Sequence, residues 1–109
     1  MYNKITLVGH LAEDPDIQKT AKGYPVINLK IITSTNWKNP HTLEIKHATE
    51  THRVTAFSEC ATTAETLKKG ALVFIGGRLK TTSFENAQGV RHATVGVQAE
   101  NIMILKNDL

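Results

Sequence analysis

The chain has 109 residues and a formal net charge of +3, with 40% hydrophobic and 21% charged residues. This balance excludes an intrinsically disordered chain and predicts one globular domain, residues 1–109, with a single modest core. The mild positive charge permits a polyanionic partner without requiring one. The single cysteine, Cys60, excludes an internal disulfide and fits a reducing compartment.

Membrane and exported proteins are disfavoured by the hydropathy pattern. No apolar run approaches the roughly 18 residues of a membrane span. The alternating pattern begins directly after Met1, so we expect no signal or transit peptide. We therefore expect a cytoplasmic protein.

Residues 2–11 alternate in polarity around Ile5, Leu7 and Gly9 and are predicted to form the first strand. Gly9 within such a pattern indicates a bend in the sheet. The next segments are predicted to be a break, a short extended continuation and a turn, at residues 13–15, 16–20 and 21–23.

Residues 25–35 form the second predicted strand, because isoleucine and leucine alternate there with polar side chains. Residues 36–49 show no sustained apolar period. We interpret them as a long hairpin loop that carries one exposed aromatic residue, Trp37.

Residues 51–57 are the third predicted strand and have two different faces. One face is ordinary for a buried surface and carries His52, Val54 and Ala56. The other face presents Arg53 and Phe57 among threonines, and thus offers a cation for phosphate and a ring for a base. The alternative is an amphipathic strand whose arginine is solvated and whose phenylalanine packs in a core.

Residues 59–69 change to a helical period, since Cys60, Ala64 and Leu67 recur on one face. The candidate start signals are Ser58, or Thr62 with Glu65 as a capping box. Lys68 and Lys69 suit the negative end of the helix dipole, and Gly70 is a candidate C-terminal cap.

The last two strands are predicted at residues 71–84 and 90–99, joined by a turn at residues 85–89. Residues 102–105 continue the second of them. Gly76 and Gly77 indicate a sharp bend. In the first of these strands, Val73, Ile75 and Leu79 are expected on one face and Phe74, Arg78 and Lys80 on the other, with Lys80 outward. In the second, the residues expected to face inward are Ala93, Val95, Val97 and Ala99.

The predicted order is three strands, one short helix and two more strands, with glycines at bends. This order is typical of an all-β OB-fold, a five-stranded barrel with one helix between the third and fourth strands. Such barrels bind oligonucleotides, oligosaccharides or proteins, so the fold alone leaves the function open.

Four segments then resemble one family in the same order along the chain. They are NKITLVGHLAEDP from Asn3, HRV with AF from His52, LKKG from Leu67, and VFIGGRLKT from Val73. Together they resemble the single-stranded DNA-binding protein (SSB) family of bacteria and mitochondria, over about residues 3–105. The resemblance implies an OB-fold homotetramer without enzymatic activity. It also implies a cytoplasmic location at the bacterial nucleoid, with the mitochondrial matrix less favoured because no transit peptide is expected. Such a protein would bind single-stranded DNA with little sequence preference and protect it during replication, recombination and repair.

The resemblance also implies a set of binding residues. The family's stacking aromatic residues fall on Trp37, Phe57 and Phe84, and Thr51 replaces the remaining family tryptophan. The basic contacts fall on Lys4, Arg53, Lys68, Lys69 and Lys80. His52 matches a histidine at a subunit interface, and the first strand, with Tyr2, Ile5 and Leu7, is expected to take part in assembly. A tetramer is expected, with a dimer as the alternative.

Two departures from the family pattern keep other functions open. Glu59, Thr82 and Ser83 stand where the family often has Lys or Arg, and the lost tryptophan should weaken binding further. The sequence also stops at Leu109, before the acidic tip that bacterial members carry, so either a tail has been removed or the protein is a tail-less relative. The alternatives are a tail-less accessory protein of a primosome, mobile element or RNA-binding assembly, and an OB-fold protein-interaction module.

No enzyme signature supports a catalytic function. The five histidines are scattered, none in an HExxH pattern, and Cys60 lies on the predicted buried helix face. His41 and His47 do not have the spacing of a zinc site. We therefore expect no metal and no cofactor.

Overall fold

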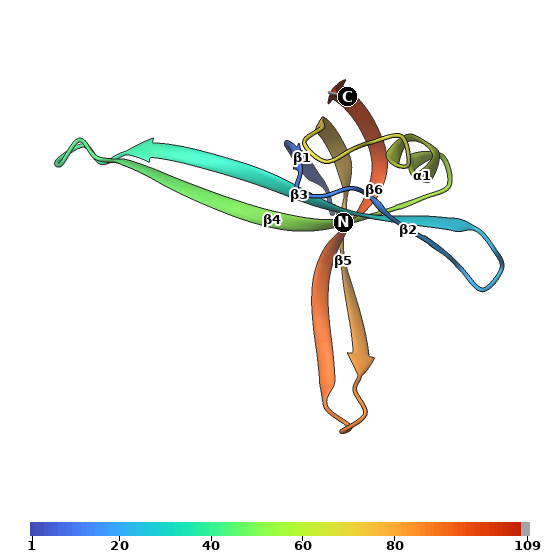
Figure 1. Ribbon diagram of the computed structural model, residues 1–109. Helices are drawn as coiled ribbons and strands as arrows, with labels where there is room; N and C mark the ends of the chain where they lie inside the picture. Colours follow the sequence, from blue (N-terminus) through green and yellow to red (C-terminus); the bar gives the residue numbers. More distant parts are fainter. Residues whose placement is uncertain (108–109) are drawn as a thin grey trace.

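The computed structural model describes residues 1–107, apart from the side chain of Phe84. Figure 1 shows a small barrel from which two long hairpins project. The elements in chain order are β1 (Ile5–Leu11), β2 (Asp16–Lys19), β3 (Pro25–Lys38), β4 (Ile45–Phe57), α1 (Ser58–Ala64), β5 (Leu72–Glu85) and β6 (Arg91–Lys106).

The barrel closes because β1 pairs with two neighbours. The sheet order is β1-β5-β6-β4-β3-β2, and β1 also pairs with β3 at His10 and Leu11. All pairings are antiparallel except β4 with β6, which are parallel at Val54 and Thr55. The short β2 extends the β3 edge rather than the ring. The prediction of a five-stranded OB-fold with one short helix is confirmed.

The core fills the barrel with the inward residues of alternating strands. Ile27, Ile31, Val73 and Ile75 are fully buried, as period-two alternation predicts. Helix α1 contributes Ala61 and Ala64 to the same core, and it contacts β3, β4 and β6. In the described residues, no helix is long and apolar enough to cross a membrane.

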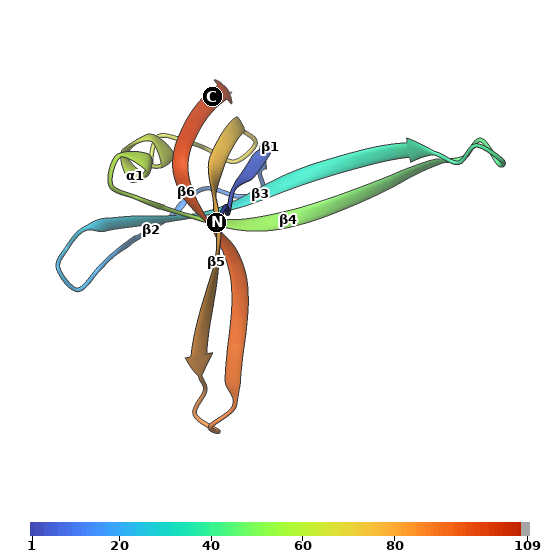
Figure 2. The same cartoon turned by 180° about the vertical axis from the view of Figure 1, so that it is seen from behind.

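The β3–β4 hairpin corrects one prediction. Residues 36–49 were expected to be a loop, but β3 continues to Lys38 and β4 begins at Ile45, with pairs out to Lys38 opposite Ile45. The two strands leave the barrel as an arm, clear in Figures 1 and 2. Both faces of a two-stranded arm meet water, so it needs no apolar alternation and the sequence carries no strand signal there.

The inward assignments near the β5–β6 hairpin are also corrected. Val97 and Ala99 are buried as predicted, whereas Val95 is 63% exposed and Ala93 is exposed too. Leu79, predicted on the same face as the buried Val73 and Ile75, is 47% exposed. The exposed residues continue the correct alternation, but they lie where β5 and β6 have left the barrel as a second arm (Figure 2). Strand alternation tells which face a residue occupies and not whether anything covers that face.

The helix is shorter than the predicted residues 59–69. It spans Ser58–Ala64, its N-cap is Phe57 without a side-chain cap, and Glu65 is its C-cap. Neither proposed cap therefore forms. Leu67 is buried as predicted, but through turns bonded from Leu67 N to Ala64 O. The last helical turn has no basic residue, so Lys68 and Lys69 do not face the helix dipole, and Gly70, at a φ of 91°, ends the following turn.

Candidate nucleic-acid interface

A groove of about 510 Å³ lies on the outer surface of the barrel, where the two arms diverge. Its charged side chains come from five separate places in the chain: Glu13, Asp16, Lys30, Arg53 and Lys80. Phe57, Asn28, Thr55, Thr82, Thr94 and Gln98 line it as well. Among the described residues, the groove therefore combines cations, carboxylates, hydroxyl and amide groups and the aromatic ring of Phe57.

One wall of the groove is the outward face of β3 and β4. The register places Lys30 opposite Arg53, and Asn28 opposite Thr55. Thr55 Oγ1 donates to Asn28 Oδ1 at 3.2 Å. Because side chains alternate along a strand, Arg53, Thr55 and Phe57 share this face, as the sequence predicts, while Val54 between them is buried.

Phe57 occupies the end of that wall. It is the last residue of β4 and the N-cap of α1, with an extended backbone at φ −123°. Phe57 is 39% exposed. A ring held by its neighbours with part of its surface open to solvent is suited to stacking against a base.

The opposite wall comes from β5 and β6. Lys80 lies opposite Gly96 and Thr82 opposite Thr94. A Cβ at Gly96 would lie 3.4 Å from the Arg53 carbonyl oxygen, so β6 runs close to β4 at this point. Lys80 and Arg53 thus line the same groove from different strands, so both cations are available to neutralise phosphates of one strand.

The groove also holds charges that sequence reasoning missed. Lys30 Nζ lies 3.1 Å from Glu13 Oε1, and Asp16 lines the same end. The only sequence signal was that Lys30 points outward on its strand. Its position opposite Arg53 depends on the β3–β4 register, which a single sequence does not reveal.

Two of the predicted stacking positions lie away from this groove. Trp37 is 51% exposed, near the end of the β3–β4 arm and opposite Lys46. By alternation it lies on the other face of the arm from Lys30 and Arg53. Thr51 is exposed and lines a second hollow of about 400 Å³. The prediction for the Phe84 side chain lies outside the described residues.

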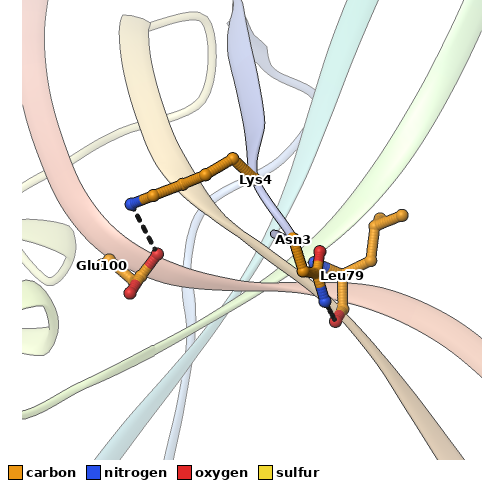
Figure 3. Close-up of polar contacts among 4 residues, drawn as sticks. All are labelled: Asn3, Lys4, Leu79 and Glu100. Atoms are coloured by element: carbon orange, nitrogen blue, oxygen red, sulfur yellow. Dashed lines mark hydrogen bonds and ion pairs between the residues drawn. The ribbon is translucent and has the colours of Figure 1, made fainter. Parts of the chain in front are cut away.

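Three predicted basic contacts are also outside the groove. Lys4 Nζ forms an ion pair with Glu100 Oε1 at 3.1 Å, drawn in Figure 3. Lys68 and Lys69 are exposed in the turns after α1, where the Lys69 backbone N–H donates to Asp14 Oδ1 at 2.8 Å. These assignments stay predictions for a nucleic acid that extends beyond the groove.

The predicted assembly residues occupy different environments. Tyr2 is 89% exposed, Ile5 is half-buried beside the second hollow, and Leu7 is 7% exposed within the core. His52 Nε2 lies 2.8 Å from Thr33 Oγ1. Because the Leu7 side chain is buried, Leu7 can contact a partner subunit only through its backbone. Next to these residues, Asn3 holds β5 through Nδ2 to the Leu79 carbonyl oxygen at 2.9 Å (Figure 3).

Metal and thiol chemistry find little support. Among the described residues, no group of three or more His, Cys, Asp or Glu side chains is placed to hold a metal ion. Burial, followed by the charges of Glu59 and Glu100, raises the pKa of the Cys60 thiol above its usual value. This shift makes the thiol less nucleophilic at neutral pH.

The barrel and its groove define an OB-fold protein with a surface suited to an extended polyanion that carries rings. The sequence profile described as "Single-strand binding protein family" matches residues 2–105, and the chain belongs to that family.

Two solved structures show the same fold. One, described as a Plasmodium falciparum SSB complex with ssDNA, has a TM-score of 0.85 and 23% identity and covers 97% of both chains. The other is a deletion mutant of the single-stranded DNA binding protein from Thermus aquaticus, with a TM-score of 0.82 and 26% identity. That match covers 96% of this chain but 51% of the Thermus chain, so this chain spans about half of its length.

Proposed function

We propose that this protein binds single-stranded DNA with little sequence preference, through the groove between its arms. The observation that carries the proposal is the convergence of Arg53, Lys80 and Phe57, from β4 and β5, on that one groove. Membership of the single-strand binding family, and a similar structure described as a complex with ssDNA, support it.

Each part of the groove has a distinct task in this proposal. Arg53 and Lys80 neutralise backbone phosphates, and their contribution weakens as salt rises. Phe57 stacks on a base, which tolerates any sequence because every base has a π face. As in its family, the protein then protects single strands during replication, recombination and repair.

The test is a titration of labelled oligo-dT, followed by fluorescence anisotropy at several salt concentrations. Replacing Arg53 or Lys80 by Gln should each reduce the slope of log K against log salt by about 0.7. Lys22→Gln, in the exposed turn outside the groove, is the matched control and should leave the slope unchanged. Unaltered slopes in both groove variants would move the binding site elsewhere.

We further propose that the protein assembles through β1, as a homotetramer. Val8, Phe74 and Met103 lie side by side on the outer face of β1, β5 and β6, and Val8 is 52% and Met103 54% exposed. Within the described residues, the second edge of β1 has no strand neighbour over residues 5–9. An open edge beside an apolar face favours pairing with another copy.

Light scattering of Val8→Glu tests this assembly. Val8 points out of the barrel, so a charge there should weaken assembly and reduce the molar mass measured in solution, without unfolding the monomer. Leu43→Glu, at the exposed turn of the β3–β4 arm, provides a control with the same added charge. A dimeric wild-type mass would support the accessory-protein role, for which single-stranded RNA should be compared with DNA.

A protein-interaction module is the second candidate function. The carboxylates of Glu13 and Asp16 inside the groove favour it, because they oppose a polyanion. It predicts no salt-dependent binding of any oligonucleotide, which the same titration would reveal.

A further inference from the structure

An ion pair lies at the wall of the groove that β3 and β4 form. Lys30 Nζ and Glu13 Oε1 lie 3.1 Å apart, and both residues line the groove. Lys30 is thus a cation at the proposed binding surface whose charge is already matched by a carboxylate of the same chain.

The positive charge of Lys30 is stabilised by an anion because Arg53 lies next to it. Lys30 lies directly opposite Arg53 in the β3–β4 register. Two like charges at opposite positions of an antiparallel pair repel one another. A carboxylate beside Lys30 relieves that repulsion while the groove is empty.

The backbone holds Glu13 in place for this role. The Ala12 N–H donates to the Lys30 carbonyl oxygen at 2.9 Å. This hydrogen bond fixes the residue before Glu13 to β3, the strand that carries Lys30. Asp14, on the other side, accepts from the Lys69 N–H at 2.8 Å. Glu13 is therefore tied on both sides, and its carboxylate is presented to Lys30 by the fold.

We infer that Glu13 is an intramolecular substitute for a DNA phosphate. Its carboxylate pairs with Lys30 in the free protein and is displaced by a phosphate when a DNA strand enters the groove. The inference rests on the proposed function. It makes Glu13 a determinant of affinity and of salt sensitivity, because Lys30 must give up one anion to gain another.

The exchange is feasible because the pair is accessible to water. The side chains of Lys30 and Glu13 are 50% and 59% exposed, and exposed pairs of this kind are weak. The pair therefore lowers the contribution of Lys30 to binding without blocking it.

A double-mutant cycle tests the exchange. Wild type, Glu13→Gln, Lys30→Met and the double variant are titrated with oligo-dT by anisotropy at low and moderate salt, after thermal unfolding has shown that each is folded. We expect Glu13→Gln to bind more tightly. We expect Lys30→Met to cost about two- to fivefold more affinity in the Glu13→Gln background than in wild type, the range set by the strength of an exposed pair. The loss should shrink as salt rises.

The control is Glu65→Gln, which makes the same charge change at the exposed C-cap of α1, outside the groove lining. It should bind like wild type.

Equal costs of Lys30→Met in both backgrounds would overturn the inference alone, since Glu13 would then act only by general repulsion. The inference also fails if Glu65→Gln matches the gain of Glu13→Gln. Absence of salt-dependent binding by the wild type would overturn the proposed function, and the inference with it.

Discussion

Gly77 of β5 faces the backbone of Gln98 on β6 so closely that a Cβ at Gly77 would lie 2.3 Å from the Gln98 carbonyl oxygen. The pairing register shifts between Gly76 and Gly77, at the point where the sheet bends. Backbone cannot move aside as a flexible side chain can, so this contact excludes any larger residue.

Gly77→Ala should therefore destabilise the barrel, by about 1–3 kcal/mol, as overpacking in a close-packed interior does. Gly76→Ala is the matched control, because its nearest neighbour to a new Cβ is the Phe74 ring at 3.6 Å, an ordinary contact. Thermal unfolding would measure both. An equal change of stability in the two variants would show that the clash with the Gln98 backbone does not limit position 77.

Phe57→Leu should weaken binding of single-stranded DNA by about 5- to 150-fold, which corresponds to the roughly 1–3 kcal/mol of one base–aromatic stack. Leucine keeps the apolar contacts of the partly buried ring and removes the π face. Tyr24→Leu, an exposed aromatic residue outside the groove, is the control. Anisotropy titrations give the affinities, and unchanged binding by Phe57→Leu would remove the ring from the interface.

Trp37 should respond to strand length. It lies on the face of the β3–β4 arm opposite to Lys30 and Arg53, so a strand confined to the groove does not reach it. An oligo-dT of about 8 nucleotides, within the range one OB-fold accommodates, should bind without quenching its fluorescence. One several times longer should quench it. Quenching by the short strand would place Trp37 at the primary site, with anisotropy confirming that both strands bind.

Cys60 should react slowly with iodoacetamide in the folded protein. Burial and the charges of Glu59 and Glu100 raise its pKa, so less thiolate is present at a given pH than in the unfolded chain. The raised pKa also means that the protonated Cys60 thiol stabilises the folded state. This contribution to the free energy of unfolding is complete below the unfolded-state pKa and is lost as pH rises through the folded-state pKa. Alkylation rates across this range measure the shift. Cys60→Ser, which removes the only thiol, should abolish the alkylation. Equal alkylation rates for the folded and unfolded chains would contradict the raised pKa.

The sequence predicts the barrel well because burial leaves a period-two pattern. Ile27, Ile31, Val73 and Ile75 all occupy the core where alternation puts them. The arms were missed or misread because the pattern records burial, and neither face of an arm is buried. Trp37 and Val95 are the clearest cases, one assigned to a loop and the other to the core.

The candidate site was predicted only in part. Arg53, Phe57 and Lys80 all line the groove, and strand alternation and the family resemblance point to the same three positions. Lys30 and Glu13 were not assigned to the site. Their meeting depends on which residues of two strands lie opposite each other and on how the segment after β1 is tethered, and neither is written in local periodicity.

The two arms divide the molecule into regions of different local stability. Paired strands without a covering layer are marginal in water, whereas the barrel is closed around a buried core. Amide protons of the arms should therefore exchange with solvent much sooner than those of the barrel strands. We expect the arms to deform more readily than the barrel, so that their shape can adapt while the core that positions Arg53 and Phe57 stays unchanged.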